Sequence, residues 1–134
     1  PGGESGVWSF GEEVYGILST YLHLRERMSR YTRELMQEAH ETGAPVMRQM
    51  FYEFPGDTLC WYIQDQYMYG PDLLVAPVVY ASARERSVYL PEGAVWHDMY
   101  SGEQFAGGQQ ISCAAALDVI PVFLRNGKRR ELLA

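Results

Sequence analysis

The chain has 134 residues, of which 47% are apolar and 13% are aromatic, and its formal net charge is −6. This length suits one domain, or the end of one domain joined to a small second one, and the apolar content excludes a disordered chain. No basic stripe exists beyond the short cluster Lys128-Arg129-Arg130, so we expect no nucleic-acid partner. No apolar run approaches the roughly 18 residues of a membrane span, so we expect no membrane partner either.

Cys60 and Cys113 are the only cysteines, and their spacing fits no metal site. We therefore expect two free thiols and a reducing, cytoplasmic location, with a single disulfide as the alternative. The sequence starts at Pro1-Gly2-Gly3, without a methionine or a secretory signal. This start does not have the form of a natural cytosolic N-terminus.

A long helix is predicted after a loop at residues 1–10. Ser9 and Glu12 have the spacing of a capping box at its start. Gly43 suits the left-handed position that follows a helix, and Pro45 prevents the helix from continuing. Apolar residues recur at steps of three and four along one face, at Val14, Ile17, Leu18, Tyr21, Leu22, Met28, Tyr31, Leu35 and Ala39.

A strand is predicted at residues 46–54, where β-branched, aromatic and methionine residues precede the turn Pro55-Gly56-Asp57. A helix followed by a strand is the order of a (β/α) barrel unit. Only one such unit is present, and the predicted strand has no partner strand in the first half of the chain.

Short apolar segments alternate with turn residues after Asp57. The segments are residues 73–79, 86–90, 95–99, 109–112 and 119–125, and the separators include Pro91-Glu92-Gly93, Ser101-Gly102 and Gly107-Gly108. Strands at this spacing are typical of a small antiparallel sandwich, so the predicted fold class is α+β.

Several ordered motifs carry a resemblance that covers nearly the whole chain. They are Trp8-Ser9-Phe10-Gly11-Glu12, the segment from Arg25 to Tyr31, Pro45-Val46-Met47-Arg48 with Glu53-Phe54-Pro55, Asp65-Gln66-Tyr67-Met68 with Gly70-Pro71-Asp72-Leu73-Leu74-Val75-Ala76-Pro77-Val78, Tyr89-Leu90-Pro91 with Trp96, Asp98 and Ser101-Gly102, and Ile120-Pro121-Val122-Phe123-Leu124-Arg125. In this order the motifs resemble the C-terminal end of glycoside hydrolase family 31, the α-glucosidases and α-xylosidases. The chain departs from that pattern at Arg30 and Gln49, where the family usually has proline.

The resemblance implies a division of the chain into two parts. Residues 1–57 would be the last helix and strand of a (β/α)8 catalytic barrel, and residues 58–134 the proximal C-terminal β-sandwich. Retaining glycosidases use two carboxylates about 5–5.5 Å apart. In the family both are Asp, and both precede the point that matches Trp8, so we expect no catalytic and no substrate-binding residue in this chain.

Asp98 lies in a segment that imitates a nucleophile motif. Trp96-His97-Asp98-Met99-Tyr100 nearly matches the family's W-x-D-M-N, yet it stands between Pro91-Glu92-Gly93 and Ser101-Gly102, where the family has a sandwich W-x-D. We therefore expect Asp98 to stabilise a hairpin rather than to attack a sugar.

The remaining polar candidates are expected to have structural roles. Glu12 and Glu13 would cap the helix, and Asp65 and Asp72 would accept hydrogen bonds from loop amides. Arg48 would pair with a buried acid or carbonyl, because an unpaired buried guanidinium is costly. The histidines His23, His40 and His97 are too far apart in sequence for a shared site, so we expect no metal and no cofactor.

The aromatic residues leave an alternative open. Trp61, Tyr62, Tyr67, Tyr69, Trp96 and Tyr100 could form a sugar-stacking platform, although packing of the sandwich and its junction is favoured. Trp8 could approach the rim of an active site. The sequence thus predicts a structural segment of a retaining α-glycosidase, inactive alone, and the alternative is a non-catalytic carbohydrate-binding or self-associating module. In either case the strand edge and the apolar helix face predict a homo-oligomer.

Overall fold

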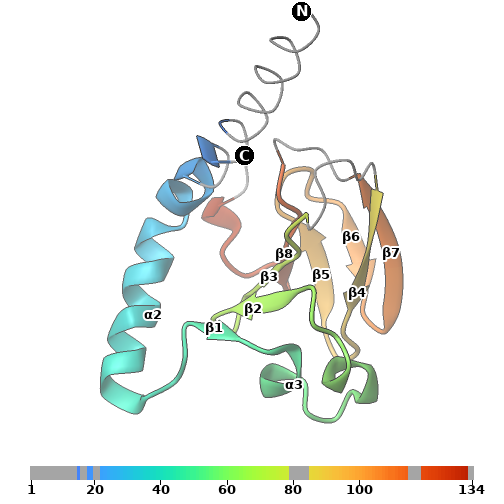
Figure 1. Cartoon of the computed structure of the whole chain (residues 1–134), viewed down its shortest axis with the longest axis horizontal. Coiled ribbons are helices and arrows are strands. Elements are labelled where there is room, and N and C mark those ends of the chain that lie inside the picture. Colours follow the sequence, from blue (N-terminus) through green and yellow to red (C-terminus); the bar gives the residue numbers. More distant parts are fainter. Residues whose placement is uncertain (1–14, 16–17, 20–21, 79–84, 115–118, 133–134) are drawn as a thin grey trace, which may run out of the picture.

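The computed structural model describes residues 15, 18–19, 22–78, 85–114 and 119–132. The predicted loop at residues 1–10, the cap proposed for Ser9 and Glu12, and the residues Trp8 and Glu13 lie outside this part. The described part is mostly antiparallel β-structure with few helices (Figure 1). This architecture agrees with the predicted small β-sandwich.

The strands of the described part form two sheets. They are β1 (Met47–Arg48), β2 (Tyr67–Tyr69), β3 (Leu73–Val75), β4 (Glu85–Leu90), β5 (Val95–Asp98), β6 (Gln104–Ala106), β7 (Gln109–Ala114) and β8 (Val122–Arg125). The larger sheet has the order β1-β2-β3-β8-β5-β6, and β4 pairs with β7 in the smaller one. Each of these pairs is antiparallel.

The central strands β3 and β8 are buried on both faces. Leu74 and Phe123 belong to the core cluster that contains residues of β4, whereas Leu73 and Leu124 belong to the cluster that contains residues of the helix α2 (Ser29–Thr42). Since neighbouring residues of a strand point to opposite faces, a strand covered on both sides requires a continuous apolar run. The two clusters therefore explain why these segments are apolar without alternation.

The end of the long helix is confirmed at Gly43. This residue has a φ of 77°, and its N–H donates to Ala39 O at 2.9 Å. Tyr31 and Leu35 are buried on the face that was predicted to be apolar. Residues 22–27 are also helical, with a turn at Met28 before α2 begins. Leu22, although on the predicted apolar face, is 59% exposed.

The strand predicted at residues 46–54 is wrong over most of its length. Only β1 is extended, and α3 (Met50–Glu53) follows as one turn of helix. Met50 and Phe54 are both buried, and their spacing of four places them on one side of a helical turn. The Phe54 N–H donates to Met50 O at 3.0 Å. Packing of these two side chains into the core thus outweighs the β-propensity of the segment.

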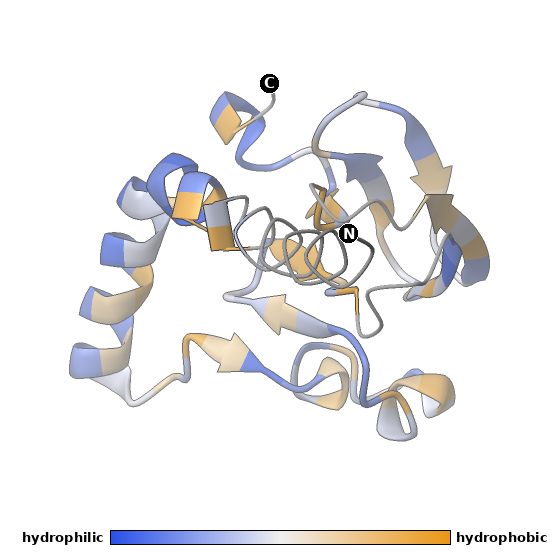
Figure 2. Ribbon diagram, turned by 45° about the horizontal axis from the view of Figure 1, so that its top comes forward, coloured by the Kyte–Doolittle hydropathy of each residue, from blue (hydrophilic) through white to orange (hydrophobic). Residues whose placement is uncertain are grey.

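The partner of β1 comes from the second half of the chain. Met47 is in register with Tyr69, and Arg48 with Met68, so β1 is an edge strand of the larger sheet. The described part also contains two short 3-10 helices, η1 (Thr58–Trp61) and η2 (Arg130–Leu132). Figure 2 shows hydrophobic and hydrophilic residues alternating along α2. Within the described ranges, no helix has both the length and the hydropathy required to cross a bilayer.

Candidate functional site

Asp98 has the hairpin role that the sequence predicts. Its Oδ1 accepts hydrogen bonds from the N–H groups of Tyr100 at 2.8 Å and Ser101 at 3.1 Å. The Gly102 N–H donates to the Asp98 carbonyl at 2.8 Å, which closes the turn between β5 and β6. The carboxylate therefore holds the turn that ends β5.

Asp65 and Asp72 differ from the prediction, because among the described residues their carboxylates contact basic side chains rather than loop amides. Asp65 Oδ2 lies 3.3 Å from Nη2 of Arg86. Asp72 is 7% exposed, and its Oδ2 accepts from Arg129 Nε at 3.1 Å. Because Asp72 is largely withdrawn from water, its carboxylate requires charge-assisted partners such as this guanidinium.

Asp57 instead has the role of accepting loop amides. Its Oδ1 accepts from the Leu59 N–H at 3.2 Å, and its Oδ2 accepts from the Glu92 N–H at 3.1 Å and from Tyr89 Oη at 2.6 Å. Burial and the hydrogen bond to Asp57 raise the pKa of Tyr89 well above its usual range. Asp57 was predicted only as a turn residue, and its place directly before η1 makes it the N-cap of that helix.

Glu53 is the centre of a partly buried ion-pair network. Its Oε2 lies 2.7 Å from Arg48 Nη1, and its Oε1 lies 2.8 Å from Arg125 Nη1. The Arg48 Nε donates to Pro45 O at 2.7 Å. The prediction that Arg48 pairs with an acid or a carbonyl is therefore confirmed, and the structure shows both kinds of partner. Arg125 also donates to Pro71 O at 3.1 Å, and its guanidinium lies 4.3 Å from the centre of the Phe54 ring.

The network joins elements that are distant in sequence. Arg48 belongs to the edge strand β1 and is 5% exposed, whereas Arg125 belongs to the central strand β8. Glu53, at the end of α3, bridges them across 72 residues of sequence to Arg125. The burial of Arg48 predicts a partner from the sequence, whereas Glu53 stands out there only as part of the motif Glu53-Phe54-Pro55. The arrangement can hold strands together, and each Glu53 carboxylate oxygen has a cationic partner.

A hollow of about 350 Å³ lies beside this network and is lined in part by Met47, Arg48, Gln49, Asp65 and Tyr67. Arg48 contributes to its wall, yet the guanidinium is already bonded to Pro45 O and Glu53. The histidines are elsewhere, with His23 and His40 exposed and His97 on β5. Among the described residues, no three His, Cys, Asp or Glu side chains gather as they would around a metal ion.

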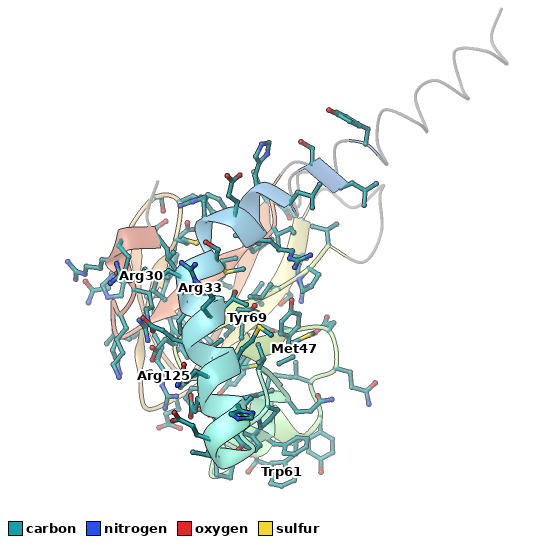
Figure 3. The ribbon with its side chains drawn as sticks, turned by 90° about the vertical axis from the view of Figure 1, so that its left-hand side faces the viewer. Arg30, Arg33, Met47, Trp61, Tyr69 and Arg125 are labelled. Atoms are coloured by element: carbon teal, nitrogen blue, oxygen red, sulfur yellow. The ribbon has the colours of Figure 1, made fainter. Side chains whose placement is uncertain are left out.

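The proposed aromatic platform is divided by the fold. Trp96 is fully buried and donates from Nε1 to Pro91 O at 3.0 Å. Tyr69 is half-buried behind α2, where its ring lies 6.0 Å from that of Tyr31 (Figure 3). Tyr67 and Tyr100 are also half-buried. These four residues therefore do not form one exposed surface.

Trp61 is one of two exposed residues of the predicted aromatic platform. It is 54% exposed, and it stacks on Phe51 with ring centres 4.5 Å apart and an interplanar angle of 8°. Its Nε1 donates to Pro55 O at 2.9 Å, so the indole is held in place. The neighbouring Tyr62 is 78% exposed.

Both cysteines are free in the structure, as predicted. Cys60 is fully buried, and burial raises the pKa of its thiol to about 12. Burial also raises the pKa of the half-buried Cys113. Because the thiolate is the reactive form of cysteine, Cys60 is not an activated nucleophile at neutral pH.

The chain is similar to known proteins over most of its length. The family model for the Glycosyl hydrolase family 31 C-terminal domain matches residues 43–128. Alpha-glucosidase 2 of Bacillus thermoamyloliquefaciens is 38% identical over 120 residues, which are 90% of this chain and 15% of that protein. An alpha-xylosidase of Saccharolobus solfataricus is 33% identical over 126 residues, which are 94% of this chain and 17% of that protein.

Solved structures show the same similarity. The crystal structure of a GH31 alpha-xylosidase from a soil metagenome, complexed with xylose, superposes with a TM-score of 0.82 and 48% identity. The match covers 95% of this chain and 19% of that chain. The chain thus spans between 15% and 19% of the length of these three relatives.

Proposed function

The chain belongs to glycoside hydrolase family 31, and we propose that it serves as the C-terminal structural segment of a retaining α-glycosidase. The longer enzyme would hydrolyse α-linked glucosides or xylosides through a covalent glycosyl–aspartate intermediate. The observation that supports this most strongly is the match of residues 43–128 to the family's C-terminal domain. The alpha-glucosidase and alpha-xylosidase relatives support the substrate class.

We propose that residues 1–57 are the end of the (β/α)8 barrel and residues 58–134 the proximal sandwich. The helix that ends at Gly43 and the short strand β1 would be the last helix and strand of the barrel. In this arrangement Glu53 would connect the two parts, because it binds Arg48 on β1 and Arg125 on β8. The pairing of β1 with β2 also crosses the proposed boundary.

We propose that the two catalytic Asp residues lie in the longer enzyme, before the part that matches this chain. The acids described above support this assignment, since Glu53, Asp57, Asp72 and Asp98 each have structural partners. A nucleophile needs a carboxylate that faces the sugar, with a second carboxyl group about 5–5.5 Å away.

The isolated chain is therefore expected to hydrolyse neither an aryl α-glucoside nor an aryl α-xyloside. Release of the aryl group from the purified chain measures this directly. The control is Asp98→Asn, which removes the residue that imitates the nucleophile motif. Hydrolysis by both the chain and this variant would contradict the proposal, because the catalytic carboxylates would then lie among residues to which we assign structural roles.

A second candidate function is that of a carbohydrate-binding or self-associating module. The fixed and exposed indole of Trp61 favours it, since aromatic faces that are held in place lose little conformational entropy on binding. Trp96, the other tryptophan of the predicted platform, is buried and cannot present its ring to a sugar. Sugar binding by this module would therefore depend on Trp61.

We further propose that the chain forms a dimer or a larger oligomer when it is separate from the rest of the enzyme. Leu22, Met47 and Trp61 are each more than half exposed, and β1 is an edge strand. Uncovered apolar side chains and strand edges favour pairing with another chain. Light scattering should give a mass of at least twice 15.3 kDa, and a monomer at every concentration would contradict this proposal.

A further inference from the structure

The basic cluster Lys128-Arg129-Arg130 lies in a turn that contacts both the sheet and the helix α2. The turn follows β8 and runs through residues 126–132. Asn126 fastens its start to β5, since the Val95 N–H donates to Asn126 Oδ1 at 2.9 Å and the Asn126 N–H donates to Val95 O at 2.6 Å. Figure 1 shows the turn beside α2, although the two are far apart in sequence.

Arg129 contacts three different side chains at this junction. Its Nη1 lies 2.7 Å from Glu34 Oε2 on α2, and its Nε donates to Asp72 Oδ2 at 3.1 Å. The guanidinium also lies over the ring of Tyr31, 4.5 Å from the ring centre. A planar guanidinium can make such ionic and stacking contacts at once, which an ammonium group cannot.

The backbone at Arg129 is in an unfavourable region. Its φ is 64°, in the left-handed region that is uncommon for residues other than glycine. This conformation persists only when surrounding contacts favour it. The three contacts of the side chain account for an arginine at a position where glycine would fit the backbone better.

Tyr31 connects the arginine to the sheet. Its Oη accepts from the Asp72 N–H at 3.1 Å and donates to Tyr69 O at 2.8 Å. The turn at Gly70 lies so close that a Cβ there would be 2.3 Å from Tyr31 Oη. Helix α2 is thus held tightly against the turn between β2 and β3. The guanidinium of Arg129 lies over the ring of Tyr31 at this contact.

The end of the turn also contacts the helical segment. Arg27 donates from Nη2 to the Leu132 carbonyl. The Leu132 side chain is 5% exposed and belongs to the cluster of Leu24, Met28 and Leu35. Polar contacts therefore hold the turn in place at Arg129, and apolar packing of the Leu132 side chain holds its end in place.

We propose that residues 126–132 form a clasp that fastens α2 to the sandwich, and that Arg129 is the residue that closes it. The clasp connects α2, near the start of the described chain, to residues 126–132 at its end, and the connection runs through Glu34, Asp72 and Tyr31. If α2 belongs to the barrel, which rests on the proposed function, the clasp also holds the sandwich to the catalytic domain.

Hydrogen exchange of the full chain tests the clasp. In Arg129→Ala, amides of α2 should exchange roughly tenfold faster or more, because two charge-assisted contacts to the helix and its neighbouring turn are lost. Amides of β5 and β8 should change by less than about twofold, since local opening of α2 does not require these strands to open. The matched control is Arg130→Ala, whose guanidinium contacts Gly127 O and which should leave α2 unchanged.

The variant Arg129→Gly separates the side chain from the backbone. Glycine relieves the left-handed conformation, so a turn limited by backbone strain would become more stable. The clasp predicts the opposite, with α2 amides exchanging faster than in the parent chain. Equal exchange of α2 in Arg129→Ala and Arg130→Ala, or slower exchange in Arg129→Gly, would overturn the proposal. Neither outcome depends on whether the longer protein is a glycosidase.

Discussion

The Glu53→Ala variant should lose about 3–5 kcal/mol of the free energy of unfolding, because it leaves two arginines without their shared anion. Arg48 is 5% exposed, so its guanidinium has little access to water that could replace the lost carboxylate. Arg125 is 24% exposed and lies over the Phe54 ring, where it keeps only its contact with the Pro71 carbonyl and the aromatic face. Equilibrium denaturation with urea, followed by tryptophan fluorescence, measures this loss.

The control for this variant is Glu38→Ala, which removes a different acid from the same guanidinium. Glu38 Oε1 lies 3.7 Å from Arg48 Nη2, and its side chain is 44% exposed. An exposed pair of this kind contributes less than about 1 kcal/mol. Glu53→Gln should fall between the two, because the amide keeps the shape but lacks the charge. Equal losses for Glu53→Ala and Glu38→Ala would show that Glu53 does not hold the strands together.

The network around Glu53 crosses the proposed boundary between barrel and sandwich. A boundary at residue 57 separates Arg48 and Glu53 from Arg125, yet the three side chains share one partly buried contact. Loss of this contact would destabilise several elements at once, because β1, α3 and β8 meet there. We therefore expect the two parts to unfold together rather than separately.

The sequence predicted the features that depend on local chemistry. The helix ends at Gly43 because its φ of 77° suits glycine, and this requirement can be recognised from Thr42-Gly43 with Pro45. The strands β4, β5 and β7 were predicted within two residues of their ends, since turn residues bound their apolar runs. The pairing of Arg48 with an acid followed from the cost of burying a lone cation.

Features that depend on distant contacts were missed. β2 and β6 have three residues each, too few for a period of two to be recognised. Asp72 was assigned to loop amides because its partner Arg129 is 57 residues away. The segment after Arg48 turns into α3 because Met50 and Phe54 pack into a core that forms from much later residues.

The central claim is that this chain is a structural segment of a retaining α-glycosidase. Its most direct test is the activity of a related enzyme into which this chain has been grafted. The soil-metagenome alpha-xylosidase is 48% identical to this chain over the matching segment, which is 19% of that enzyme. We would replace that segment with this chain and compare the graft with the same enzyme lacking the segment. Hydrolysis of an aryl α-xyloside is the measurement, and a graft that carries Glu53→Ala is the matched variant.

If this chain supplies structure and the catalytic carboxylates lie elsewhere in the longer enzyme, the graft should be active and the shortened enzyme inactive. The Glu53→Ala graft should lose its activity at a lower temperature, since its strands are held less firmly. A graft that is folded by circular dichroism yet has no activity would contradict the account.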